Sequence, residues 1–264
     1  MDTKIGGYCV MIALEGVCKT WDGGKSFAVS DLSLRIEPGE VLALLGGSGS
    51  GKSTTVKMIN RLIEPTSGVI EIDGENVVEQ DPVQLRRRIG YVFQSIGLFP
   101  HMTILENVCI LPKMLGHDSL EYREKGSRLL EMVDLPASQF AHRYPHQLSG
   151  GQRQRVGFAR ALAVDPKVML LDEPFGALDP VTRDSLQSEF TRLQKELGFT
   201  AVIVTHDMAE ALLLADKIAV MRDGKLLRLG TPRDLLLDAG DDYVAQLLET
   251  PRRHGRLIHD LETN

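Results

Sequence analysis

Apolar and polar residues divide the chain into segments with two different periodicities. Residues 41–45 form an uninterrupted apolar run, which is typical of a strand buried on both faces. Residues 181–197 repeat apolar positions every three or four residues, as one face of a helix does. Together these patterns predict strands over Cys9–Val17, Phe27–Ile36, Val41–Leu45, Val168–Leu171 and Ala201–Thr205, helices over Lys52–Leu62, Leu120–Val133, Gln152–Ala163, Val181–Leu197 and Met208–Ala215, and hairpins around Asp73-Gly74 and Asp223-Gly224.

The middle of the chain lacks the strand pattern. Between about Ser95 and Val164 helical periodicity dominates, and the alternation of strands and helices resumes at Val168. An α/β core interrupted by a helical insertion explains this order. We therefore predict one domain over residues 1–250, with a core of about 1–94 and 165–250, a helical subdomain of about 95–164, and a short C-terminal tail over 251–264.

Composition narrows the class of protein. The 264 residues include 30 basic and 36 acidic side chains, a net charge of −6, which argues against a protein that coats nucleic acid. The basic run Arg86-Arg87-Arg88 is interpreted as the solvated face of a helix. No apolar run approaches the roughly 18 residues of a membrane span, and Cys9, Cys18 and Cys109 lack the spacing of a disulfide or zinc framework. These features predict a cytoplasmic protein.

A glycine-rich segment between a predicted strand and a predicted helix has the form GxxxxGK[ST]. It reads Gly46-Gly47-Ser48-Gly49-Ser50-Gly51-Lys52-Ser53. Glycines let backbone N–H groups turn toward phosphate oxygens, and the helix start adds the positive end of a dipole. Lys52 can bridge β- and γ-phosphates, and the Ser53 hydroxyl can bind Mg²⁺. The segment therefore predicts a phosphate-binding loop.

Two carboxylates follow the apolar strand Val168–Leu171. A strand beside a phosphate loop places its terminal carboxylate near Mg²⁺, so Asp172 is predicted to hold the metal through water. Glu173 points onward and is predicted to polarise the attacking water as a general base. A solvated pair that caps the strand is the alternative when this motif is taken alone.

A second candidate anion site precedes another predicted helix. Leu148-Ser149-Gly150-Gly151-Gln152 places small residues at a helix start, where N–H groups and the helix dipole favour an anion. The chain thus carries two helix starts suited to phosphate, about a hundred residues apart. A γ-phosphate held between them, within one chain or across a dimer, is the natural inference, and an ordinary helix cap is the alternative.

In combination and in order, these motifs resemble the ATP-binding-cassette (ABC) ATPases, the nucleotide-binding subunits of ABC transporters. The resemblance covers roughly Val10 to Leu248, and it includes Gln94, Ala177-Leu178-Asp179 and His206 besides the motifs above. It implies an α/β fold: a P-loop NTPase core with an N-terminal antiparallel β subdomain and an inserted α-helical subdomain. It also implies ATP and Mg²⁺ as ligands.

The resemblance implies a role for each matching position. Gln94 resembles the Q-loop glutamine, which senses Mg²⁺ and the attacking water, and His206 resembles the switch histidine that contacts the γ-phosphate. Asp179 resembles the D-loop residue at a dimer seam. Ser149 and Gly151 would grip the γ-phosphate bound by the opposite copy in a head-to-tail ATP-sandwich dimer. The implied catalytic residues are Glu173, His206 and Gln94, the metal site is Ser53, Gln94 and Asp172, and the nucleotide contacts are Trp21, Gly46, Gly47, Ser48, Gly49, Ser50, Gly51, Lys52, Ser53, Thr54, Ser149, Gly150, Gly151, Gln152 and Asp179.

One position departs from the family pattern. The adenine-stacking aromatic of the family is commonly a tyrosine, whereas the matching position after Lys19-Thr20 holds Trp21, the only tryptophan of the chain. An indole can stack on adenine for about 1–3 kcal/mol. A tryptophan at an interface or in the core is the alternative.

Within the family, the segments Gln94–His101, Asp172–Asp184 and Asn60–Pro65 resemble most the ATPases of osmoprotectant importers, which take up glycine betaine, choline, carnitine and similar quaternary amines. Many members of that subgroup carry paired CBS modules in a C-terminal extension, for which these 264 residues leave no room. The resemblance implies permease subunits that hold the chain at the inner face of the cell membrane. It also implies a substrate-binding protein as an indirect partner, and no nucleic acid.

The segment Leu98–Met102 directly follows the Q-loop position and mixes apolar residues with loop formers. We expect it to line a groove that receives a short cytoplasmic helix of the permease. Packing within the helical insertion is the alternative for these side chains.

The predicted function is an ATP-hydrolysing motor subunit of a quaternary-amine importer. An importer of another small solute, such as an amino acid, is the first alternative. A soluble ABC protein of translation or DNA repair usually has tandem cassettes or a long coiled coil, and the sequence has neither. A non-hydrolysing regulator conflicts with the presence of Glu173, Gln94 and His206.

Overall fold

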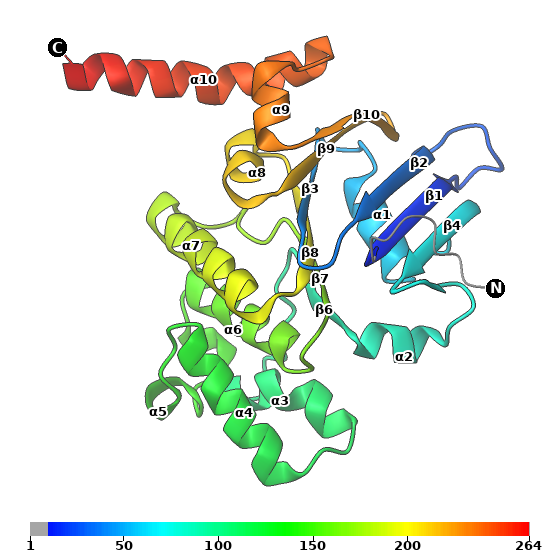
Figure 1. Ribbon diagram of the computed structural model, residues 1–264. Coiled ribbons are helices and arrows are strands. Elements are labelled where there is room, and N and C mark those ends of the chain that lie inside the picture. Colours follow the sequence, from blue (N-terminus) through cyan, green and yellow to red (C-terminus); the bar gives the residue numbers. More distant parts are fainter. Residues whose placement is uncertain (1–9, 264) are drawn as a thin grey trace.

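A computed structural model describes residues 10–263 of the chain. It contains a smaller sheet of strand order β2-β1-β4-β5 and a larger sheet of order β10-β9-β3-β8-β7-β6. Most of the helical mass lies on the side of the larger sheet that faces away from the smaller one (Figure 1). The strands are β1 (Ile12–Lys19), β2 (Val29–Ile36), β3 (Val41–Leu45), β4 (Ser67–Ile72), β5 (Glu75–Asn76), β6 (Ile89–Val92), β7 (Val168–Asp172), β8 (Thr200–Thr205), β9 (Lys217–Arg222) and β10 (Lys225–Gly230).

The larger sheet brings four separate loops of the chain to one edge. Strands β3, β8, β7 and β6 are parallel neighbours in that order, and every residue in them is buried. Alternate residues of β3 belong to two separate hydrophobic clusters, so both faces of the sheet are covered, which explains the unbroken apolar runs. Because carboxyl ends of parallel strands meet at one edge, the segments after Leu45, Val92, Asp172 and Thr205 come together there.

The smaller sheet is antiparallel and buries one face. In β2, Leu32, Leu34 and Ile36 are buried, while the polar residues between them are exposed. Strand β1 pairs with β2 on one side and with β4 on the other. The sheet confirms the predicted N-terminal antiparallel β subdomain, and the strand and helix order of the whole chain confirms the predicted α/β fold class.

Between Val92 and Val168 the described chain forms helices and no strand. Helices α3, α4 and α6 pack against one another and make the helical subdomain. The helices of the chain are α1 (Lys52–Ile59), α2 (Pro82–Arg87), α3 (Ile104–Met114), α4 (Ser119–Met132), α5 (Ala137–Phe140), a 3₁₀ turn (Pro145–Gln147), α6 (Gly150–Leu162), α7 (Pro180–Leu197), α8 (Met208–Leu214), α9 (Pro232–Leu237) and α10 (Asp242–Thr263).

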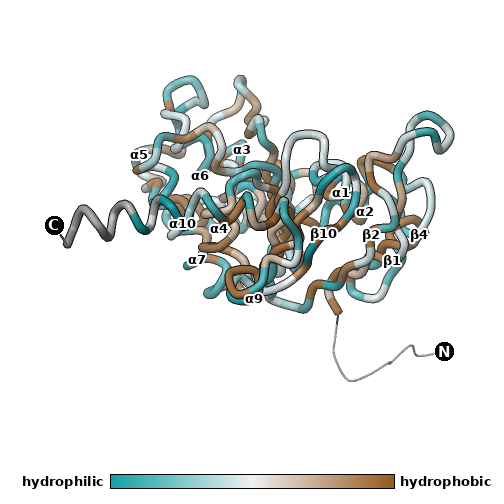
Figure 2. The backbone as a smooth tube through the Cα atoms, turned by 90° about the horizontal axis from the view of Figure 1, so that it is seen from above, coloured by the Kyte–Doolittle hydropathy of each residue, from teal (hydrophilic) through white to brown (hydrophobic). Residues whose placement is uncertain are grey.

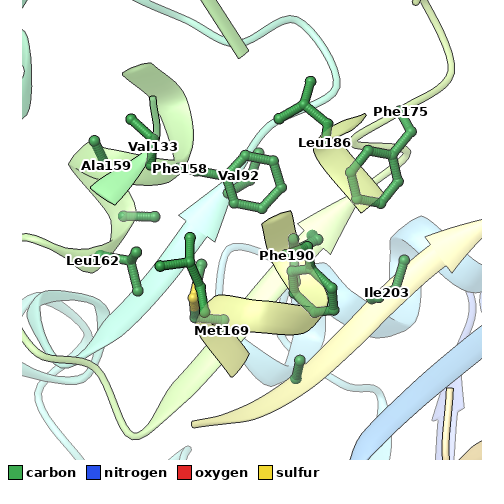
Figure 3. Packing of buried hydrophobic residues seen from close by; sticks show 14 of the residues in the cluster. Val92, Val133, Phe158, Ala159, Leu162, Met169, Phe175, Leu186, Phe190 and Ile203 are labelled. Carbon is green, nitrogen blue, oxygen red and sulfur yellow. The ribbon is translucent and has the colours of Figure 1, made fainter. Parts of the chain in front are cut away.

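Four phenylalanines join the helical subdomain to the larger sheet, and three of them, Phe158, Phe175 and Phe190, are labelled in Figure 3. The rings of Phe158, Phe175, Phe190 and Phe199 lie 6.0–6.4 Å from their neighbours in the cluster. Phe175 is fully buried and follows Glu173 by two residues, so its ring anchors the loop that carries this carboxylate. Hydrophobic residues follow the strands in the middle of the molecule (Figure 2), as burial of the sheet requires.

Every strand and helix that the hydrophobic pattern predicts is present, with ends shifted by a few residues. The predicted first strand began at Cys9, which lies outside the described residues. Several elements were not predicted, among them β6, α3, α9 and α10. Helix α10 runs without a break through positions 250 and 251, the predicted boundary between the domain and the tail.

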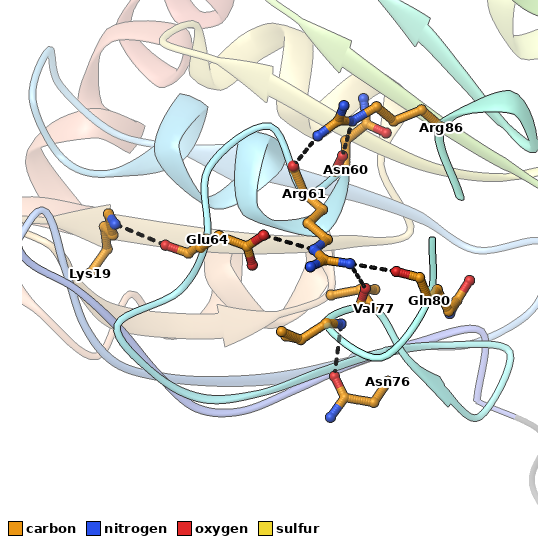
Figure 4. A network of polar contacts seen from close by, with 9 residues as sticks. Lys19, Asn60, Arg61, Glu64, Asn76, Val77, Gln80 and Arg86 are labelled. Carbon is orange, nitrogen blue, oxygen red and sulfur yellow. Dashed lines mark hydrogen bonds and ion pairs between the residues drawn. The ribbon is translucent and has the colours of Figure 1, made fainter. Parts of the chain in front are cut away.

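The interpretation of Arg86-Arg87-Arg88 as a solvated face is wrong for Arg86. Its guanidinium is half-buried and donates to the backbone carbonyls of Asn60, at 3.3 Å, and of Arg61 (Figure 4). The reason is that α2 packs beside the residues that follow α1, whose carbonyls need donors. Arg86 therefore fastens α2 to the end of the helix that starts at the phosphate loop.

Arg61, which directly follows the end of α1, makes further polar contacts in the same region (Figure 4). Its guanidinium donates to the carbonyls of Val77 and Gln80 and lies 2.8 Å from the carboxylate of Glu64. Lys19 of β1 donates to the carbonyl of Glu64 at 2.8 Å. These polar contacts tie α1 to the smaller sheet.

No helix within residues 10–263 has the length and apolarity needed to cross a membrane. Cys18 and Cys109 are free thiols. Cys109 is buried between α3 and α4, and burial raises the pKa of its thiol to about 11. Cys109 is thus a small core residue, while Cys9 lies outside the described part of the chain.

Candidate nucleotide-binding site

The glycine-rich loop connects the carboxyl end of β3 to α1, as predicted. A Cβ on Gly46 would lie 2.1 Å from the carbonyl oxygen of Met221, and one on Gly51 would lie 2.4 Å from that of Ala28. Only glycine fits at these two positions, so the loop packs tightly against β9 and the start of β2. Gly51 is the N-cap of α1 and offers no side-chain acceptor, which leaves the N–H groups at the start of this helix available to an anion.

Lys52 curls back over the loop that precedes it. Its Nζ lies 2.8 Å from the carbonyl oxygens of Gly46 and Gly47 and 3.3 Å from Ser50 Oγ. Burial lowers the pKa of Lys52, and the carboxylates of Glu173 and Asp172 oppose that effect. The Lys52 ammonium group thus contacts backbone carbonyls of the loop, and a bound phosphate can replace these carbonyls as its partner.

Asp172 ends β7 next to the start of α1. Its Oδ1 accepts a hydrogen bond from Ser53 Oγ at 2.8 Å, and only 7% of the residue is exposed. A hydroxyl and a carboxylate side by side supply the oxygen ligands that Mg²⁺ prefers, and Mg²⁺ in ATPases takes one or two protein ligands together with substrate phosphates. Ser53 and Asp172 therefore fit the Mg²⁺ that the motifs predict here.

Glu173 has a strained backbone and two polar neighbours from other loops. Its φ is 47°, in the left-handed region, and its N–H donates to Val204 O at 3.1 Å. Gln94 Nε2 donates to Oε2 of this carboxylate at 2.9 Å, and His206 Nδ1 lies 3.5 Å from Oε1. The four sheet-edge loops thus deliver Lys52 with Ser53, Asp172 with Glu173, Gln94, and His206 to one place, as predicted.

The segment Ser149–Gln152 lies at the start of α6. Ser149 Oγ accepts from the N–H of Gln152 at 3.2 Å, and Gln152 Oε1 accepts from the N–H of Ser149 at 2.9 Å, a reciprocal capping box. A Cβ on Gly151 would lie 2.3 Å from Thr182 Cγ2, so this glycine allows the start of α7 to approach. Within residues 10–263 no hydrogen bond joins the segment to the phosphate loop.

Among residues 10–263, neither Asp179 nor Trp21 forms a hydrogen bond with the catalytic cluster. Asp179 is the N-cap of α7, where its carboxylate accepts from Thr182 N at 3.1 Å, and these hydrogen bonds lower its pKa. Trp21 is 66% exposed in the connection between β1 and β2, and Lys19 Nζ lies 4.2 Å from its ring centroid. An exposed indole with a free face is geometrically able to receive an adenine.

One contact to the phosphate loop was not anticipated. The hydroxyl of Tyr243, in the first turn of α10, accepts a hydrogen bond from Gly47 N–H at 3.0 Å. The guanidinium of Arg222 lies 4.9 Å from the ring centroid of Tyr243. A separation of 196 residues and the absence of a motif around Tyr243 left no signal in the sequence for this contact.

The expected groove after Gln94 is present in part. A groove of about 490 Å³ lies between the core and the helical subdomain, lined by the exposed apolar side chains Leu62, Phe93, Phe99 and Met114. Within the segment Leu98–Met102, which was expected to line this groove, Phe99 lines it. Leu98 packs on the core and Met102 borders a different, smaller pocket, so these two follow the packing alternative.

The fold and this site define a P-loop nucleoside-triphosphate-binding protein with a helical insertion. The family model described as "ABC transporter" matches residues 29–176, more than half of the chain. The chain belongs to the ABC transporter family of ATP-binding proteins.

Similar proteins support this assignment. The chain is 53% identical to the choline transport ATP-binding protein OpuBA of Bacillus subtilis over 92% of its own length, but it spans only 63% of that relative. It is 48% identical to the glycine betaine uptake system ATP-binding protein YehX of Escherichia coli, and it spans 80% of that protein. A solved dimer of the ATP-binding cassette MJ0796 in a post-hydrolysis state with ADP and Pi superposes with a TM-score of 0.76, at 38% identity, over 84% of this chain and 99% of MJ0796.

Proposed function

We propose that this chain hydrolyses ATP and that Glu173 is the general base. The observation that carries the proposal is the position of this carboxylate, which lies between Gln94 and His206 and one residue beyond Asp172. A carboxylate held by an amide donor and an imidazole can accept the proton of a water that attacks the γ-phosphorus. Breakage of the bond between the β- and γ-phosphates then releases ADP and phosphate.

The remaining residues of the site neutralise charge on the phosphates and orient the Glu173 carboxylate. Lys52 and the N–H groups at the start of α1 offer positive charge to the phosphate oxygens. Ser53 and Asp172 would hold Mg²⁺, which neutralises charge on the phosphates when it is bound. Gln94 and His206 fix the direction of the Glu173 carboxylate and hence the path of the attacking water.

The experiment compares ATP turnover and ATP affinity of the wild-type chain and of Glu173→Gln. The substitution keeps the shape of the side chain and an amide oxygen that can still accept from Gln94 Nε2, but it removes the base. Turnover is expected to fall at least about 10²-fold with affinity for ATP retained. Turnover close to that of the wild type would contradict the role of Glu173.

We further propose that two copies close around ATP, with Ser149 and Gly151 of one copy facing the nucleotide of the other. The dimeric MJ0796 structure, bound to ADP and Pi, supports this arrangement for a chain of the same fold. The capping box uses the N–H of Gln152, and residues 10–263 provide no acceptor for the N–H groups of Gly150 and Gly151 at the start of α6, which suits an incoming anion.

The same reasoning leads to a permease as the membrane partner. The groove lined by Phe93 and Phe99 lies directly beside Gln94, and its exposed apolar side chains suit a short apolar helix. Asn107, fully buried, fixes this edge because its side chain bonds both the N–H and the carbonyl of Phe99, at 2.7 and 3.1 Å. Phe99→Ala is expected to abolish ATP-driven uptake while basal ATP turnover persists, and normal uptake would contradict the proposal.

For the transported solute we propose quaternary amines such as choline, glycine betaine or carnitine, with a substrate-binding protein as an indirect partner. Several relatives at about 50% identity are ATP-binding proteins named for the transport of choline, carnitine or glycine betaine, which supports this class. Uptake of radiolabelled choline and glycine betaine by vesicles that contain the cognate permease tests it. Uptake of an amino acid instead would favour the alternative importer.

A further inference from the structure

Two helices start beside the candidate active site, and both begin with a capping aspartate. Asp179, expected at the dimer seam, caps α7. Asp207, the neighbour of His206, caps α8 and accepts from the N–H groups of Ala209 and Glu210. A contact between these two helices would therefore link the seam to the histidine that faces Glu173.

Such a contact is made by Glu210, in the first turn of α8. Glu210 is only 6% exposed, and its Oε2 lies 3.5 Å from Gln187 Nε2 of α7. Arg183 projects from the turn of α7 that precedes Gln187, and its Nη1 lies 3.9 Å from Asp207 Oδ2. The Nη2 group of Arg183 donates to Leu178 O at 3.2 Å, in the loop that leads to Asp179.

The polar groups in this contact are incompletely paired among the described residues. Glu210 Oε1 and Arg183 Nε are both buried and have no hydrogen-bond partner. Both residues line a cavity of about 30 Å³ whose other walls include Glu173 and His206. A polar cavity of that volume is large enough for one water molecule, and a water could satisfy both atoms.

Burial makes the carboxylate sensitive to these neighbours. It raises the pKa of Glu210 to about 7; Thr205, Arg183 and Gln187 act in the opposite direction, while Asp207 adds to the rise. Arg183 of α7 attracts the carboxylates of Asp207 and Glu210 on α8, and this attraction resists separation of the two helices, because an unpaired buried charge is strongly disfavoured.

We propose that Arg183 and Glu210 are positioning residues that, with one bound water in the cavity behind Glu173, fix His206 relative to the Asp179 loop. The inference rests on the proposed ATPase function and extends it to residues outside the phosphate loop. We call this contact of Arg183 on α7 with Asp207 and Glu210 on α8 the joint. Through the joint, a partner copy that contacts the Asp179 loop sets the position of His206 and thereby the turnover of ATP. Neither side chain touches the nucleotide or the reacting atoms.

The test uses Glu210→Gln and Arg183→Met in the full chain. Both keep the approximate shape of the side chain, and Arg183→Met also serves if Glu210→Gln fails to fold, because Arg183 is one-third exposed and tolerates change better. Glu189→Gln is the matched control: this glutamate is also buried on α7, but it pairs with Arg155 of the helical subdomain. The readouts are kcat, KM for ATP, ATP affinity, and the urea midpoint.

Displacement of catalytic groups by about an ångström can lower rates about 10²-fold, so kcat of Glu210→Gln and Arg183→Met is expected to fall about 10- to 100-fold. KM and ATP affinity should stay within about twofold, since the phosphate loop is untouched. The double variant should be no slower than the slower single variant, because one joint is broken in each case. Glu189→Gln should shift the urea midpoint with kcat retained.

Two results would overturn the proposal. If both variants keep kcat within about twofold while Glu173→Gln is inactive, the joint has no catalytic role and the proposed ATPase function still stands. If kcat falls only in proportion to loss of folded protein, as the urea midpoint reports, the joint is structural. Failure of the ATPase function itself would be seen separately, as normal turnover of Glu173→Gln.

Discussion

The hydrogen bond between Tyr243 and Gly47 predicts that the C-terminal helix contributes to nucleotide affinity. Tyr243→Phe removes a single hydroxyl, which accepts from the phosphate-loop N–H at 3.0 Å, and leaves the ring beneath Arg222. One neutral hydrogen bond contributes about 0.5–1.5 kcal/mol net. If the bond holds the loop in the conformation that receives phosphate, ADP affinity should fall about 2- to 12-fold.

Fluorescence titration with a labelled ADP, in the presence of Mg²⁺, measures this change. Tyr122→Phe is the matched control, because it removes the hydroxyl of a partly buried tyrosine in the helical subdomain, for which the described residues provide no hydrogen-bond partner. Affinity equal to the wild type would refute the reasoning. Tighter binding would refute it too, because it would mean that the hydroxyl competes with phosphate for Gly47 N–H.

Three further predictions concern stability and adenine binding. Arg61→Ala removes donors to two carbonyls and an ion pair, and should lower the free energy of unfolding by about 1–3 kcal/mol; a urea midpoint that does not move would refute this. Trp21→Ala should weaken ATP binding about 5- to 150-fold by equilibrium titration, with most affinity kept in Trp21→Tyr, and unchanged affinity would refute the stacking role. Burial raises the pKa of Glu189 to about 7, so the folded state binds the extra proton and this residue's contribution to stability falls as pH rises from about 4.5 to 7. A plot of the urea midpoint against pH over that range should be less steep for Glu189→Gln than for the wild type. Parallel plots would argue against a raised pKa of Glu189.

The sequence was most informative where one local pattern determines one structure. The apolar runs Val41–Leu45 and Val168–Leu171 belong to strands of a sheet that is covered on both faces, so every residue in them is buried and apolar. The motifs around Lys52 and Asp172 end those strands, so their meeting at one sheet edge follows from parallel pairing. The site's central cluster was predictable for that reason.

Elements that depend on tertiary contacts were not predictable. Strand β6 has four residues, too few to show a periodicity, although it delivers Gln94 to the site. Helix α3 contains Pro112, which obscures the helical pattern. Arg86 resembled a solvated charge because its acceptors, two carbonyls about 25 residues away, have no sequence signature. The contacts of Tyr243 and of Glu210 are equally non-local.

The central claim is that ATP is bound between two copies of this chain and hydrolysed with Glu173 as the base. Light scattering of purified Glu173→Gln, with MgATP and then with MgADP, tests it most directly. The account predicts twice the monomer mass with MgATP, monomers with MgADP, and monomers with both nucleotides when Ser149 is also replaced by a bulky residue. A Glu173→Gln protein that binds ATP and stays monomeric would contradict the account.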